Sequence, residues 1–101
     1  MRRGEVLAGT KTALVTGASK GIGRSYALQL AALGYNVLMV ASGEMELLAT
    51  ADEVRRVAPN VWVRSLVKDL ATPTAAEELF AYTESEGIKV DVLINNAGIF
   101  S

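Results

Sequence analysis

Residues 11–24, KTALVTGASKGIGR, constrain the fold more than any other part of the chain. The stretch begins with a short apolar run, 12–15, which is typical of a buried strand. Three glycines follow, Gly17, Gly21 and Gly23, and apolar residues then recur at helical spacing. A strand that turns through glycines into a helix N-terminus presents unpaired N–H groups, and the helix dipole there favours an anion. The stretch therefore predicts an anion-binding turn between a strand and a helix.

Composition restricts the classes of protein to which the chain can belong. Half of the 101 residues are hydrophobic, which is enough for one small domain with a core. The net charge of −1 gives no electrostatic signature for binding nucleic acid or an anionic membrane. Cysteine and histidine are absent, which excludes disulfides and thiolate or imidazole metal sites.

The N-terminal segment gives no sign of targeting or of a membrane span. Residues 6–8 form too short an apolar run for the ~7–15-residue core of a signal peptide. No apolar run approaches the ~20 residues of a membrane helix. We therefore expect a flexible leader over residues 1–10 and a cytoplasmic protein.

The first helix and the next two elements follow in short order. Gly34 stands where a left-handed C-cap would end the first helix. The continuous apolar run 37–41 predicts a strand buried on both faces. Ser42 and Gly43 break that run and could cap a second helix. Its apolar face would be formed by Leu47, Leu48, Ala51, Val54 and Ala58.

The rest of the chain repeats the pattern. Residues 61–66 alternate in polarity, which suits a strand near a sheet edge. Thr72 is expected as an N-cap with Pro73 at the first helical position. The bulk of this third helix would come from Leu79, Phe80 and Tyr82. With a fourth strand at 90–94, the order β-α-β-α-β-α-β predicts an α/β fold with a doubly wound parallel sheet.

Three motifs resemble those of the short-chain dehydrogenase/reductase family. Residues 16–23, TGASKGIG, look like its T-G-x-x-x-G-x-G cofactor motif, and residues 95–98, NNAG, look like its N-N-A-G motif. Asp69 with Leu70 matches the acidic residue that follows its third strand. The resemblance implies that residues 11–101 are the N-terminal part of an NAD(P)-binding, Rossmann-like domain with an incomplete sheet of four strands.

The resemblance also implies a set of cofactor-binding residues. The pyrophosphate and adenosine ribose would be lined by Gly17, Ser19, Lys20, Gly21, Ile22 and Gly23. Asp69 and Leu70 would lie at the adenine, and Asn95, Ala97 and Gly98 would flank the ribose. Two of these residues have structural alternatives. An amide that ends a buried strand, such as Asn95, commonly satisfies backbone groups, and Asp69 could simply help to start a helix.

The end of the second strand favours NADP over NAD. In dinucleotide-binding folds an acidic residue there binds the 2′-OH of NAD, but Ala41 and Ser42 occupy that place. Lys20 and the Ser42 hydroxyl could meet a 2′-phosphate. Members of the family that use NADP often carry Arg where Ser42 stands. The alternative is that Lys20 is a solvated loop residue and Ser42 only a helix cap.

No catalytic residue can be assigned. The chemistry that the resemblance implies is hydride transfer between the nicotinamide and a small-molecule carbonyl or alcohol substrate. The family's Tyr-x-x-x-Lys motif lies beyond its N-N-A-G segment, and Tyr26, Tyr35 and Tyr82 are not followed by Lys four residues later. We therefore expect the cofactor-binding portion of an oxidoreductase whose full-length relatives are usually homo-oligomers. The alternatives are a non-catalytic nucleotide-binding module or inactive remnant and, less favoured, a methyltransferase-type domain.

Two further expectations concern the surface. Asp91 and the pairs Glu77/Glu78 and Glu84/Glu86 are interpreted as solvated charges. The resemblance implies the strand order 3-2-1-4, which would leave Ile94 and its neighbours on an unpaired apolar edge. We therefore predict that the isolated chain folds poorly or self-associates.

Overall fold

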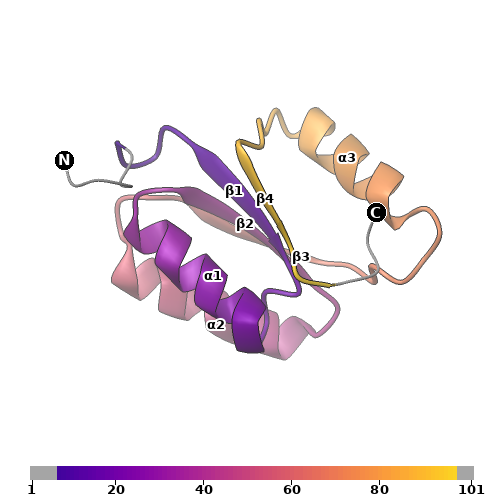
Figure 1. The fold of residues 1–101 in the computed structure, drawn as a ribbon, viewed down its shortest axis with the longest axis horizontal. Coiled ribbons are helices and arrows are strands. Elements are labelled where there is room, and N and C mark those ends of the chain that lie inside the picture. The colour runs from indigo at the N-terminus through magenta and orange to yellow at the C-terminus, as the bar shows by residue number, and fades with distance from the viewer. Residues whose placement is uncertain (1–6, 98–101) are drawn as a thin grey trace.

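A four-stranded parallel sheet lies between two helical layers in the computed structural model, which describes residues 7–97 (Figure 1). The strands stand in the order β3-β2-β1-β4, and each neighbouring pair is parallel. The elements are β1 (Thr12–Thr16), α1 (Gly21–Ala32), β2 (Asn36–Ala41), α2 (Glu44–Val57), β3 (Val63–Val67), α3 (Ala75–Ser85) and β4 (Val92–Asn95). The α/β class, the doubly wound sheet and the strand order are confirmed.

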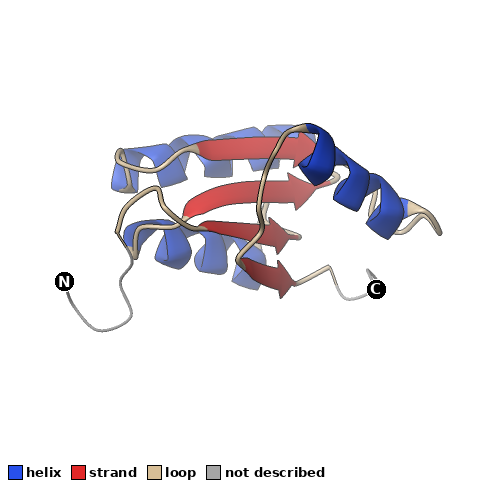
Figure 2. Cartoon of the chain, turned by 90° about the horizontal axis from the view of Figure 1, so that it is seen from above, coloured by secondary structure: helices blue, strands red, loops and turns tan. Residues whose placement is uncertain are grey.

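The two faces of the sheet carry different helices. α1 and α2 lie side by side on one face, and α3 lies on the other (Figures 1 and 2). Along β2, Val37 and Met39 point to the α1/α2 layer, whereas Leu38 and Val40 point to α3. Every residue of β2 is buried, as expected of an interior strand with helices on both faces.

The turn after α1 joins the start of the described chain. Gly34 has a φ of 107°, in the left-handed region expected of a C-cap glycine. Its carbonyl accepts a hydrogen bond from Gly9 N at 3.0 Å, so the turn at 7–10, within the predicted leader, packs against the domain. The Asn36 side chain donates to Gly9 O at 2.9 Å and accepts from Trp62 N at 3.0 Å.

Several element boundaries differ from the sequence prediction, and β4 begins at Val92 rather than at residue 90. β3 begins at Val63 rather than at residue 61. α3 begins at Ala75 with Thr74 as its N-cap, so the prediction of Thr72 as N-cap is wrong. Residues 72–75 instead form a turn, closed by a hydrogen bond from Ala75 N to Thr72 O at 3.2 Å. Pro73 occupies its second position, which suits the fixed φ of proline equally well.

Two of the apolar residues that the sequence assigned to the second and third helices are exposed. Leu48 on α2 is 47% exposed, and the buried stripe runs through Leu47 and Thr50 instead. Phe80 on α3 is 66% exposed, whereas its neighbour Leu79 is buried. A step of one residue turns a side chain about 100° around a helix axis, so adjacent apolar residues do not share a face.

Three acidic residues that were interpreted as solvated charges have structural partners. The Asp91 carboxylate accepts a hydrogen bond from Thr12 N at 2.9 Å and so joins the starts of β4 and β1. Glu86 pairs with Arg64 at 2.8 Å, and Glu78 pairs with Lys68. On β4, which is an edge strand of the sheet formed by residues 7–97, Leu93 is 53% exposed, whereas Ile94 packs against the α1/α2 core. Among residues 7–97, no helix is long and apolar enough to cross a bilayer.

Candidate functional site

A cavity of about 380 Å³ lies at the carboxyl ends of the parallel strands. Its walls come from the segments that follow β1, β2, β3 and β4. The lining residues are Gly17, Ser19, Lys20, Ala41, Ser42, Lys68, Asp69, Leu70, Ala71, Asn96 and Ala97. Open α/β sheets bind their ligands at this edge, and the volume lies in the range of small-molecule sites.

The first wall is the glycine turn between β1 and α1. Gly17 and Gly21 have φ values of 64° and 62°, in the left-handed region that favours glycine. A Cβ on Gly23 would collide with the carbonyl oxygen of Gly17, so α1 can pack this closely on the turn only without a side chain there. The N-cap Lys20 makes no side-chain capping bond, and the first turn of α1 holds no acidic residue. The first N–H groups of α1 therefore have no side-chain cap and suit an anion.

A hydrogen-bond cluster joins this turn to the end of β4. The Thr16 hydroxyl donates to Asn95 Oδ1 at 3.1 Å and accepts from Ala97 N at 3.2 Å. The Asn96 side chain donates to Gly17 O at 3.4 Å. The Asn95 side chain therefore bonds to a side chain of β1, the Thr16 hydroxyl, whereas the expected bond to backbone groups stays a prediction.

Another wall of the cavity is formed by the loop after β3. The ammonium of Lys68 lies 2.5 Å from a carboxylate oxygen of Glu78, in the first turn of α3. This hydrogen bond is the main cause that lowers the pKa of the Glu78 carboxyl below its ordinary value. Asp69 accepts a hydrogen bond from Ala71 N at 2.9 Å, and Leu70 is buried in the core under α3.

The segment after β2 carries no acidic residue. Ala41 and Ser42 line the cavity there, and Ser42 is exposed. The N-cap of α2 is Gly43, so the alternative in which Ser42 caps that helix is wrong. The charged residues that line the cavity are Lys20, Lys68 and Asp69, and the Lys68 ammonium is paired with Glu78. Within residues 7–97, no group of acidic residues could hold a metal ion.

Most residues that the sequence assigned to a cofactor site meet in this cavity. They are Gly17, Ser19, Lys20, Ser42, Asp69, Leu70 and Ala97. Four others do not line it: Gly21, Ile22, Gly23 and Asn95. Ile22 is 67% exposed and Gly23 is buried. Gly98 lies outside the described residues.

Three residues that line the cavity were not predicted from the sequence as part of a cofactor site. Lys68 and Ala71 flank the predicted Asp69, and Asn96 stands between the predicted Asn95 and Ala97. Adjacency to a predicted residue was the signal available for all three. All four residues of 68–71 line the cavity, whereas the motif marks only Asp69 and Leu70, so the sequence pattern did not show that the whole loop forms a wall.

Comparison with known sequences finds dehydrogenases and reductases. The family model described as short chain dehydrogenase matches residues 11–101. A putative steroid dehydrogenase of Caenorhabditis elegans is 36% identical over 93 residues, which cover 92% of this chain and 30% of that protein. The 3-oxoacyl-acyl-carrier-protein reductase FabG of Staphylococcus epidermidis is 43% identical over 90 residues, covering 88% of this chain and 36% of FabG.

Solved structures of longer chains share the fold. L-Sorbose reductase from Gluconobacter frateurii, solved with NADPH and L-sorbose, superposes with a TM-score of 0.80 at 29% identity. The match covers 92% of this chain and 35% of the reductase. YwfH, an NADPH-dependent reductase of bacilysin biosynthesis, gives a TM-score of 0.79 at 30% identity, covering 85% of this chain and 34% of YwfH. The chain thus spans about a third of the length of the proteins that it resembles.

Proposed function

The chain belongs to the short-chain dehydrogenase family, and we propose that residues 11–101 form the cofactor-binding portion of an NADP(H)-dependent oxidoreductase. In this proposal hydride passes between the nicotinamide and a carbonyl or alcohol carbon of a small substrate. The observation that carries it is the cavity in which the glycine turn, the Asp69 loop and the segment after β4 meet.

Each wall of the cavity has a distinct role in the proposed binding. The N–H groups that begin α1 would donate to the pyrophosphate, and Gly17 leaves room for its approach. The Asp69 carboxylate would accept a hydrogen bond from the exocyclic amine of adenine. Ala97 and Gly98 would flank the ribose, and the bond between Thr16 and Asn95 holds that segment beside β1.

The charges of the cavity support NADP(H) over NAD(H). An acidic side chain after β2 would bind the 2′-OH of NAD, and the cavity offers Ala41 and Ser42 there. Lys20 and the Ser42 hydroxyl can both donate to a 2′-phosphate, and a hydrogen bond to a charged group is stronger than one between neutral groups. Both solved relatives described above have NADPH in their descriptions.

Titration of the chain with NADPH, NADH and S-adenosylmethionine tests this function. We expect NADPH to bind tightest, NADH at least tenfold more weakly, and S-adenosylmethionine not at all. Lys20→Gln should weaken NADPH binding by about tenfold and leave NADH binding nearly unchanged. Lys11→Gln is the matched control, since Lys11 is exposed at the opposite end of β1.

The outcomes separate the parts of the proposal. NADH binding as tight as NADPH binding would contradict the cofactor preference alone. Absence of binding for both dinucleotides would contradict the function as a whole.

In this proposal none of residues 7–97 has an assigned catalytic role. A non-catalytic nucleotide-binding module is the second candidate. The coding sequence beyond residue 101 distinguishes the two candidates. An open frame that encodes Ser and then Tyr-x-x-x-Lys supports the oxidoreductase.

A further inference from the structure

The loop after β3 is tied to three different parts of the fold. Lys68 N donates to Ala41 O at 2.9 Å, which joins the loop to the end of β2. The Lys68 ammonium bonds to Glu78 on α3, and Leu70 is buried beneath the same helix. Between these anchors stands Asp69, which is exposed and lines the cavity.

Lys68 is poorly placed to act as a free cation in the cavity. Its side chain is 19% exposed, and its ammonium is already paired with the Glu78 carboxylate at 2.5 Å. A ligand phosphate would have to share the ammonium with that carboxylate. The ion pair spans ten residues of sequence and joins the cavity wall to the first turn of α3.

We propose that Lys68 is a positioning residue: its ion pair with Glu78 holds the loop at 69–71 against α3 and thereby presents Asp69 to the nucleotide. The effect on nucleotide binding rests on the proposed function, whereas the ordering of the loop does not. Glu78 does not line the cavity. Its removal should nevertheless weaken binding as much as removal of Lys68.

The first experiment needs no ligand. Lys68→Met, Glu78→Gln and the double variant are compared with wild type by hydrogen exchange of the Leu70 and Ala71 amides. We expect about two- to fivefold faster exchange in each single variant and no further increase in the double variant, because both remove the same bond. In Lys68→Arg, which keeps the positive charge, the Leu70 and Ala71 amides should exchange at the wild-type rate. Amides of β2 serve as the measure of global folding.

Glu77→Gln is the matched control for this experiment. Glu77 precedes Glu78 in the same first turn of α3 and is exposed, so its neutralisation changes the helix-dipole interaction equally. Exchange at Leu70 and Ala71 should stay at the wild-type rate in this variant. Equal acceleration in Glu77→Gln and Glu78→Gln would overturn the proposal, and so would unchanged exchange in Lys68→Met.

The second experiment measures dissociation constants of NADPH and NADH for the same variants. We expect Lys68→Met and Glu78→Gln each to weaken both cofactors by about two- to fivefold, with Glu77→Gln unchanged. If Lys68→Met weakened NADPH alone and Glu78→Gln tightened it, Lys68 would be a direct phosphate ligand and the proposal would be wrong. If wild type binds neither cofactor, the proposed function fails, and the exchange rates alone decide whether the pair orders the loop.

Discussion

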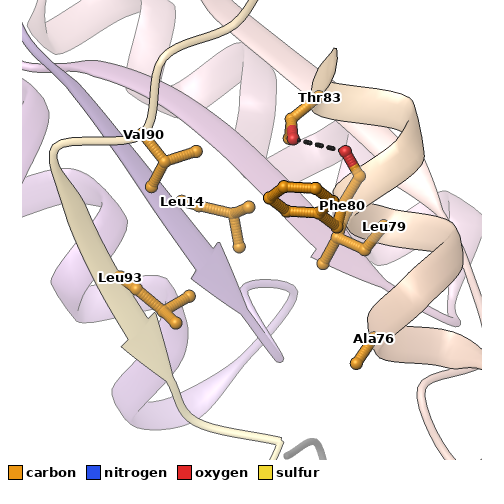
Figure 3. A pocket seen from close by; sticks show the side chains of 7 residues that line it. All are labelled: Leu14, Ala76, Leu79, Phe80, Thr83, Val90 and Leu93. Atoms are coloured by element: carbon orange, nitrogen blue, oxygen red, sulfur yellow. Dashed lines mark hydrogen bonds between the residues drawn. The ribbon is translucent and has the colours of Figure 1, made fainter. Parts of the chain in front are cut away.

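The two faces of the sheet differ in how completely helices cover them. Under α1 and α2, side chains such as Met39 and Leu47 have no exposed surface. Under α3 there is an open, almost wholly apolar cavity of about 260 Å³ between this helix and β4. Figure 3 shows Phe80 of α3 and Leu93 of β4 on opposite sides of it. Since β2 is equally buried on both faces, the difference lies in the helical cover and not in the central strand.

The uncovered apolar surface lies beside a free strand edge. β4 pairs with β1 on one side, and on its other side no strand of residues 7–97 follows. Phe80 and Leu93 expose more than half of their surface at this place. An apolar wall beside the edge strand of a sheet favours association with another chain. The prediction that the isolated chain self-associates thus acquires a specific location.

Truncation of a side chain on each face of the sheet should give the largest difference, measured as loss of the free energy of unfolding. Leu47→Ala on the covered face should lower the free energy of unfolding by about 2–5 kcal/mol, because it leaves a cavity in a packed core. Phe80→Ala on the open face should cost less than about 1 kcal/mol, since that ring is already largely solvated. Denaturant titrations measure both values. Similar losses for the two variants would show that the faces are equally packed.

The second largest effect is expected from a charge at the open face, which should reduce self-association of the chain. Leu93→Lys is expected to weaken self-association by about tenfold, because pairing at β4 would then bury an ammonium group. Leu48→Lys is the control, since Leu48 is 47% exposed on the covered face. Sedimentation velocity over a range of concentrations compares the variants. A wild-type chain that stays monomeric, or an equal effect of the two variants, would contradict the location at β4.

The smallest effect concerns the attachment of α3 through Glu78. The hydrogen bond from Lys68 lowers the pKa of Glu78, so the folded state favours the charged carboxylate. The stabilisation is therefore present above the carboxyl's unfolded pKa and is lost as pH falls through the lower, folded value. The difference in stability between wild type and Glu78→Gln should shrink in the window where the pH falls below the ordinary pKa of a glutamate carboxyl, about 4.3. A difference that does not change over this window would contradict the assignment.

The sequence predicted best those elements whose burial is uniform. β2 is buried on both faces, so its apolar run has no competing interpretation. The start of α3 was predicted wrongly because Pro73 fits the first position of a helix and the second position of a turn equally well. β3 lies at the sheet edge and is only partly buried, which weakens the pattern that marks its start.

At the cavity, residues marked by a local sequence motif were predicted, whereas pairs of residues far apart in the sequence were not. Gly17, Asp69 and Ala97 were predicted because motifs mark them, and all three line the cavity. The pairs Lys68–Glu78 and Asp91–Thr12 were missed, because their members are brought together only by the folded chain. In the sequence each of these acidic residues is indistinguishable from a solvated one.

The close approach of Gly23 to Gly17 bears on the spectrum of mutations that the gene can tolerate. Every missense codon at position 23 adds the same first atom, a Cβ, which collides with the same backbone oxygen. At Gly21 a Cβ would meet nothing within 4 Å, and its φ of 62° is one that Asn and Asp adopt more readily than other residues. In a saturation library, substitutions at 23 are therefore uniformly depleted, whereas those at 21 are ranked by backbone preference.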